Sequence, residues 1–238
     1  MKTGTQSNPK KTVAFIPASG GSTGLPRKNI KLFDGKPLFW YSIQFARKCG
    51  IPPGDIYVSS DDAEILELAD QFGVHAVKRP AARASDTSSM DSAVMHFLEE
   101  HGHCQADYAL LLQPTNPLRH INYYEEALSK IMAHNLDCVL TVNKFHKKVG
   151  KFNESGLYIP VLYHPTQRRQ DTEELYFADG MLFLFNVASF LEQGTIIGSR
   201  FSAVVTDELF GFNDIDTQLD FHVVEYLFRS FPDRYSVL

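Results

Sequence analysis

The sequence predicts an α/β protein built on a mostly parallel sheet, and three observations support this. First, short apolar runs typical of buried parallel strands lie at residues 13–16, 56–60, 108–112 and 137–142. Second, stretches with helical spacing of apolar residues separate these runs, which is the alternation that builds right-handed βαβ units. Third, glycine-rich or polar segments follow the strands, at the end where open α/β sheets bind their ligands.

The helices between the strands are located by their start and stop signals. Pro37 and Gly50 enclose a helix at residues 37–49, and the pair Asp61 and Asp62 caps a helix that runs to residue 72. An adjacent Asp pair can also hold a metal, but capping and the helix dipole favour the structural interpretation. The other elements expected are helices at residues 92–101, 122–134, 187–193 and 217–231, and strands at 74–78, 181–185 and 203–206.

Length and composition indicate one domain and restrict its partners. Of the 238 residues, 1–11 form a polar tail and 12–238 suit one domain without internal repeats. A net charge of −5 argues against nucleic acid or an anionic membrane as a partner. No apolar run reaches the roughly 18 residues of a membrane span. The three cysteines lack metal or disulfide spacing, so we expect reduced thiols in a cytoplasmic protein.

The loop after the first strand has the composition of a phosphate site. Gly20, Gly21 and Gly24 allow the backbone to approach a ligand closely, and Arg27 and Lys28 bring positive charge to the far end of the loop. This pattern predicts a triphosphate site. The alternative is an ordinary glycine-rich turn between a strand and a helix.

Two later loops are expected at the same edge of the sheet. In residues 79–91, small side chains leave room for a planar ring, and Arg79 offers donors suited to a carbonyl and a ring nitrogen. In residues 113–119, two prolines stiffen the backbone that carries Gln113 and Arg119, so we expect both side chains to be available to a ligand.

Residues 143–179 interrupt the βαβ pattern. The segment is basic, aromatic and punctuated by proline, without a helical period, and predicts extended arms or hairpins. An excursion of this kind commonly binds a partner subunit or covers a site. Its aromatic side chains would be costly to leave exposed, which favours a dimer contact.

Asp214 and Asp216 stand just before the last predicted helix. Two carboxylates separated by one residue can both reach a hard cation, and Mg²⁺ needs only one or two when phosphates and water supply the rest. The alternative is that Asp216 merely caps the helix. Spacing alone leaves the two interpretations evenly balanced.

Six motifs occur in order over about residues 12–230: I-P-A-S-G-G-S-T-G-L-P-R-K-N-I, V-S-S-D, R-P-A-A-R-A-S-D-T, L-L-Q-P-T-N-P-L-R, R-R-Q-D and D-I-D-T. Together they resemble the acylneuraminate cytidylyltransferases, the makers of CMP-activated sialic acids, including the pseudaminic and legionaminic acid enzymes. The resemblance implies a Rossmann-like nucleotidyltransferase fold and a homodimer formed through residues 143–179. It also implies a Mg²⁺-dependent reaction of CTP with an acidic nine-carbon sugar, giving CMP-sugar and pyrophosphate.

The resemblance also implies roles for single residues. Lys28 and Asn29 match a pair that reaches phosphates and ribose, and Arg79 with Ser88 matches cytosine contacts. The implied nucleotide contacts are Ala18, Ser19, Gly20, Ser22, Gly24, Lys28, Asn29, Arg79 and Ser88. The implied sugar contacts are Gln113, Arg169 (from the dimer side) and Asp179; the metal ligands are Asp214 and Asp216; and the catalytic residues are Lys28, Gln113 and Asp216.

Two departures from the family pattern keep alternatives open. Ser19 and Thr23 stand where the family usually has an arginine and a lysine over the triphosphate, and each lost charge-assisted hydrogen bond is worth about 1.5–3 kcal/mol. A catalytically weak homologue that binds nucleotide or sugar is therefore the second hypothesis. The A-D-G-M of residues 178–181 also differs from the usual N-G-A or D-A-G, which leaves the acceptor open. L-P-R-K-N argues against an octulosonic acid acceptor, because those enzymes have L-P-G-K-P.

Overall fold

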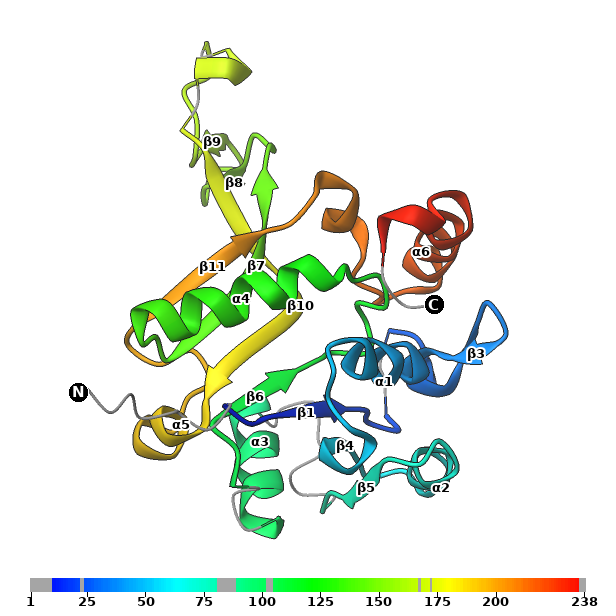
Figure 1. Ribbon diagram of the computed structural model, residues 1–238. Coiled ribbons are helices and arrows are strands. Elements are labelled where there is room, and N and C mark those ends of the chain that lie inside the picture. The colour runs from blue at the N-terminus through cyan, green and yellow to red at the C-terminus, as the bar shows by residue number, and fades with distance from the viewer. Residues whose placement is uncertain are drawn as a thin grey trace, which may run out of the picture.

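A seven-stranded sheet forms the centre of the molecule, in the order β11-β7-β10-β6-β1-β4-β5 (Figure 1). The computed structural model describes residues 10–21, 24–80, 89–101, 105–166, 168–171 and 173–235. The strands are β1 (Thr12–Pro17), β4 (Ile56–Ser60), β5 (His75–Lys78), β6 (Tyr108–Leu111), β7 (Cys138–Phe145), β10 (Leu175–Asn186) and β11 (Phe201–Val205). Every neighbouring pair is parallel except the two that β10 makes with β6 and β7. The predicted α/β fold with a mostly parallel sheet is confirmed.

Helices cover both faces of this sheet. On one face lie α1 (Leu38–Lys48), α2 (Ala63–Gln71) and α4 (Ile121–His134), and on the other lie α3 (Met90–Glu100) and α5 (Val187–Gln193). The alternation within β1 explains the two cores, because Ala14 and Ile16 belong to the first and Val13 and Phe15 to the second. The predicted helices are thus confirmed, with ends shifted by one or two residues.

The last helix, α6 (Gln218–Ser230), packs on a third core at the end of the sheet. There Phe221 and Phe228 contact the ring of Phe33 edge to face, with ring centroids 5.6 and 5.2 Å apart. Phe33 belongs to a small hairpin of β2 (Leu32–Phe33) and β3 (Lys36–Pro37) that the sequence analysis did not predict. Its two-residue turn is formed by Asp34 and Gly35, both at positive φ.

Strand β10 differs from the prediction in length and bend. It was expected at residues 181–185, but it begins at Leu175 and pairs with the whole outer half of β7 before it reaches β6. The register shifts between Ala178 and Phe183, where Gly180 has a φ of 73°. This bulge bends the strand, so residues 175–178 and the end of β7 extend beyond the body of the sheet.

This extension is the base of the arm, residues 143–179. Its hairpin of β8 (Gly150–Phe152) and β9 (Tyr158–Pro160) projects away from the sheet (Figure 1), as the predicted hairpin character requires. The hairpin leaves large apolar side chains open to solvent, among them Phe152 at 73% exposure and Leu157 at 65%. Short 3-10 helices complete the fold: η1 (Lys28–Ile30), η2 (Pro53–Asp55), η5 (Arg169–Asp171), η6 (Glu208–Phe212) and η7 (Pro232–Arg234). Within the described ranges, no helix has the length and apolar character needed to cross a membrane.

Candidate active site

A cavity of about 530 Å³ opens at the carboxyl ends of β1 and β6. These adjacent parallel strands lead to opposite halves of the sheet, and ligands of open α/β sheets bind at such a switch point. One wall is formed by the loop after β1 and by η1, and includes Ser19, Lys28 and Asn29. The opposite wall includes Gln113 from the loop after β6 and Asp216 from the segment before α6.

The glycine loop is held between two acidic segments, which explains why glycine is needed there. The Gly20 N–H donates to Asp61 Oδ1 at 3.0 Å, and a Cβ on Gly20 would lie 2.6 Å from Asp62 Cβ. On the other side, a Cβ on Gly24 would lie 2.4 Å from the carbonyl oxygen of Asp216. Neither approach leaves room for a side chain, so the loop can lie this close only with glycine at both positions.

Hydrogen bonds of Ala18 and Asn29 hold the same loop in place. The Ala18 N–H donates to the carbonyl of Ser59 at 2.9 Å, which ties the loop to the end of β4. The Asn29 amide donates from Nδ2 to the carbonyl of Ser19 at 2.8 Å and is itself buried. Ser22, Thr23 and Ser88, which the sequence analysis placed around the nucleotide, lie outside the described residues.

The two basic residues that were expected to bring positive charge to the loop point in different directions. Arg27 has a left-handed backbone with φ 52°, and its guanidinium pairs with Glu64 Oε2 at 2.6 Å. A second contact joins it to Asp62 Oδ2 at 3.6 Å, so Arg27 is directed toward α2. Lys28 instead enters the cavity, where Nζ donates to the carbonyl of Ile215 at 2.7 Å and to Asp216 Oδ1 at 3.0 Å.

The interpretation of Asp216 as a helix cap is wrong. Thr217 is the N-cap of α6, and its side chain and Asp220 form a reciprocal capping box. The Asp216 carboxylate makes no capping contact and lies at the cavity, 72% exposed. The segment before α6 therefore presents Asp216 to a ligand rather than to the helix.

Asp214 and Asp216 fit a small hard cation. Desolvation raises the pKa of Asp214, and the neighbouring Asp216 charge raises it further while a hydrogen bond with Thr115 opposes both. Like charges of this kind are what a divalent cation neutralises. No group of three or more potential metal ligands occurs among the residues described. Mg²⁺ needs only one or two protein carboxylates where ligand oxygens and water supply the other positions.

Arg79 lies at the end of β5 and is buried. Burial lowers the pKa of its guanidinium, and the nearby Asp61 charge opposes this effect. Its Nε has no hydrogen-bond partner within the described part of the chain. A buried donor left without a partner costs free energy, which a ligand acceptor would recover. Arg79 is not among the residues that line the cavity, and its contact with a planar ring stays a prediction.

Gln113 lines the cavity, whereas Arg119 does not. Arg119 is fully buried and donates from Nε to Met181 O at 2.8 Å, from Nη1 to Ser42 Oγ at 3.1 Å and from Nη2 to Gln113 O at 2.5 Å. Burial lowers the pKa of its guanidinium to about 9. The expectation that Arg119 is available to a ligand is wrong, because it ties the Gln113 loop to β10 and α1.

The residues predicted to contact the sugar lie in different parts of the structure. Asp179 is buried and accepts hydrogen bonds from the Thr141 hydroxyl at 2.5 Å, the Thr206 hydroxyl at 2.8 Å and the Met181 N–H at 3.1 Å. These contacts give Asp179 a structural role at the β10 bulge, and its sugar contact stays a prediction. Arg169 belongs to η5 in the arm, and its side chain lies outside the described part of the structure.

Asp61 and Met90 are among the contributors to the site that were not predicted from the sequence. Asp61 follows β4, the neighbour of β1, so the predicted parallel order could have placed it beside the glycine loop. Met90 begins α3 and lines the cavity, but nothing in its local sequence marks it.

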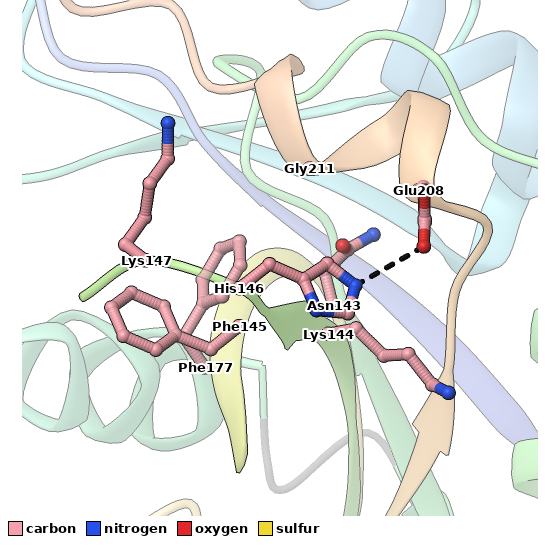
Figure 2. A pocket seen from close by; sticks show the side chains of 8 residues that line it. All are labelled: Asn143, Lys144, Phe145, His146, Lys147, Phe177, Glu208 and Gly211. Carbon is pink, nitrogen blue, oxygen red and sulfur yellow. Dashed lines mark hydrogen bonds and ion pairs between the residues drawn. The ribbon is translucent and has the colours of Figure 1, made fainter. Parts of the chain in front are cut away.

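A second hollow of about 440 Å³ lies at the base of the arm (Figure 2). Phe145 and Phe177 form an edge-to-face pair there with centroids 6.3 Å apart, and His146 Nε2 lies 3.1 Å from Glu208 Oε1. None of the predicted site residues lines this hollow. Phe145 and Phe177 supply its apolar side chains, and the other lining residues apart from Gly211 are polar or charged.

The fold and cavity define an α/β protein with a cavity at the switch point of a mostly parallel sheet. The chain belongs to the cytidylyltransferase family, whose family model matches residues 13–236.

Two relatives and one solved structure show the extent of the likeness. An N-acylneuraminate cytidylyltransferase of Streptococcus agalactiae serotype III (strain NEM316) is 31% identical over 230 residues, which cover 94% of this chain and 55% of the relative. The chain thus spans about half the length of such relatives. A pseudaminic acid cytidylyltransferase of Campylobacter jejuni (strain 81-176) is 30% identical over 226 residues, covering 92% of this chain and 97% of the relative. A CMP:2-keto-3-deoxy-manno-octonic acid synthetase complexed with CTP shares the fold, with a TM-score of 0.66, 18% identity and coverage of 92% and 99%.

Proposed function

We propose that this protein transfers CMP from CTP to the anomeric hydroxyl of an acidic nine-carbon sugar, giving CMP-sugar and pyrophosphate. The observation that carries the proposal is the meeting of the glycine loop, Lys28 and Asp216 around one cavity at the switch point of the sheet. The family match over residues 13–236 and the nearly full-length likeness to a pseudaminic acid enzyme support the same reaction.

The residues of the cavity suit an in-line displacement at phosphorus. The backbone of the glycine loop and the Lys28 ammonium bind the phosphates and stabilise the charge that develops on them. The sugar hydroxyl attacks the α-phosphorus and loses its proton, a new P–O bond forms, and the bond to pyrophosphate breaks. The buried Arg79 would contact the cytosine ring, and Gln113 would orient the sugar beside the α-phosphate.

Asp214 and Asp216 would hold Mg²⁺ in this reaction. The bound ion supplies positive charge that polarises the phosphates and favours departure of pyrophosphate. Asn116 donates from Nδ2 to Asp214 Oδ1 at 3.3 Å, which orients that carboxylate. The chain would act as one catalytic domain over residues 12–238, in the cytoplasm, where CTP is made.

The arm is proposed to form a homodimer. Its hairpin exposes Phe152, Leu157 and Tyr158, and the hollow with Phe145 and Phe177 at its base offers apolar surface for a second copy (Figure 2). In this arrangement Arg169 would reach the sugar in the neighbouring protomer. Sedimentation at micromolar concentration should show a dimer, and Phe152→Ser should weaken it. A monomer with full activity would contradict the arrangement.

A second candidate function is nucleotide or sugar binding with little turnover. Lys28 is the sole cation among the described residues that line the cavity, since Ser19 carries no charge and Arg27 pairs toward α2. A site with one cation would bind a triphosphate weakly without a metal ion.

Release of pyrophosphate from CTP tests the proposal directly. The protein would be mixed with CTP, Mg²⁺ and each of a panel of nonulosonic acids, with an octulosonic acid as the alternative acceptor. Turnover with a nine-carbon acid supports the proposal, and turnover confined to the octulosonic acid changes the acceptor. Saturable CTP binding without turnover on any acid would favour the weak homologue.

A further inference from the structure

Lys28 and Asp216 form an ion pair at the cavity. Lys28 Nζ lies 3.0 Å from Asp216 Oδ1, and the lysine side chain is only 11% exposed while the aspartate is 72% exposed. The remaining basic residue of the loop, Arg27, is engaged by Glu64 at 2.6 Å. A triphosphate that enters without a metal ion therefore meets a lysine whose charge is already compensated.

The second hydrogen bond of Lys28 has an acceptor that is fixed in the fold. Nζ also donates to the carbonyl of Ile215 at 2.7 Å. Ile215 is fully buried, and its N–H donates to the carbonyl of Thr115 at 2.9 Å, so this acceptor is fixed in place. An ammonium has three N–H donors. Lys28 can keep the Ile215 bond and exchange the Asp216 bond for a phosphate oxygen.

We propose that Lys28 is the resident counter-ion of Asp216 and is released to the nucleotide phosphates when a divalent cation takes the Asp216 carboxylate. The proposal rests on the proposed function, because it assigns an order of events within that site. It makes Lys28 a competitor of the metal as well as a phosphate ligand, because the lysine and the cation compete for one carboxylate. Cation binding then unmasks the positive charge that Lys28 brings to the cavity.

The first test is CTP affinity without metal, measured by calorimetry in EDTA. Asp216→Asn removes the charged partner of Lys28, so it should bind CTP about tenfold more tightly than the wild type, the worth of one charge-assisted contact. Asp214→Asn is the matched control, because it removes an equal charge nearby but not the Lys28 partner. In Mg²⁺ the order of CTP affinities should reverse, so that Asp216→Asn binds CTP more weakly than the wild type. The proposal would be overturned if both variants gained equally in metal-free CTP affinity, or if Asp216→Asn gained none.

The second test uses the metal alone. Titration with Mn²⁺, followed by electron paramagnetic resonance of the free ion, should show Lys28→Met binding the ion about tenfold more tightly than the wild type. Arg27→Met loses the same charge one residue away, and its pairing with Glu64 predicts no change. Equal affinity of Lys28→Met and the wild type, or an equal gain in Arg27→Met, would overturn the proposal. This titration needs no CTP, so failure of every variant to bind CTP in Mg²⁺ would refute the proposed function and still leave the counter-ion exchange decided.

Discussion

Adding a single methyl group at Gly24 tests the geometry of the site most directly. The Cβ of Gly24→Ala would lie 2.4 Å from the Asp216 carbonyl oxygen, whereas ordinary contact begins at 3.4 Å. The loop and the Asp216 segment must therefore separate by about 1 Å, and a misplacement of that size costs roughly a hundredfold in rate. The strain should also lower the free energy of unfolding by about 1–3 kcal/mol.

Gly21→Ala is the matched control in the same loop. Gly21 also lines the cavity, but a Cβ there meets nothing within 4 Å. Pyrophosphate release should therefore fall about a hundredfold in Gly24→Ala and by less than about threefold in Gly21→Ala. Thermal unfolding of both variants separates the local effect from loss of the fold. Equal rates for the two variants would refute the view that the close approach of Gly24 to the Asp216 segment sets the geometry of the site.

Three further changes probe separate features. Asp216→Asn should reduce kcat by several orders of magnitude but change the free energy of unfolding by less than about 1 kcal/mol, because Thr217 caps α6; near-normal turnover would exclude the metal role. Ser19→Arg should tighten CTP binding in Mg²⁺ by about 10- to 100-fold in calorimetry, and unchanged affinity would count against a triphosphate at this loop. Asp137→Asn should lower the free energy of unfolding by about 1–3 kcal/mol at pH 7, because Asp137 Oδ2 accepts a hydrogen bond from the Arg200 N–H at 2.8 Å. Hydrogen bonds from Arg200 and then Ser189 lower the pKa of Asp137. Its stabilisation is therefore complete above an unfolded pKa of about 3.9 and is lost as the pH falls through the lower native pKa. Chemical denaturation from pH 7 to pH 2 should show the gap between variant and wild type closing in acid, and a constant gap would contradict this assignment.

The features that the sequence predicted well are those encoded locally. β1 is an apolar run followed at once by glycines, and α1 lies between Pro37 and Gly50, so pattern and punctuation agree in both cases. The positions of Lys28 and Gln113 at one cavity followed from the same logic, because parallel strands send their carboxyl ends to one edge.

The errors concern side chains whose partners are distant in sequence. Arg27 turns to Glu64, 37 residues away, through a left-handed backbone that no local pattern marks. Arg119 is buried because Met181 O, Ser42 Oγ and Gln113 O surround it, and only the tertiary structure brings these acceptors together. Polar residue types predict a polar environment, but a guanidinium with three buried acceptors satisfies that requirement inside the protein.

Asp216 shows that the missing information was sometimes present in the sequence. Spacing alone left it evenly balanced between helix cap and metal ligand, yet Thr217 followed by Asp220 is the pattern of a capping box. The structure has this box, with Thr217 Oγ1 and Asp220 Oδ2 2.8 Å apart. Because the helix is capped one residue later, the Asp216 carboxylate is not needed for folding of α6. Its contact with Lys28 across 188 residues of sequence is therefore a property of the cavity, and a substitution that spares the helix can test it.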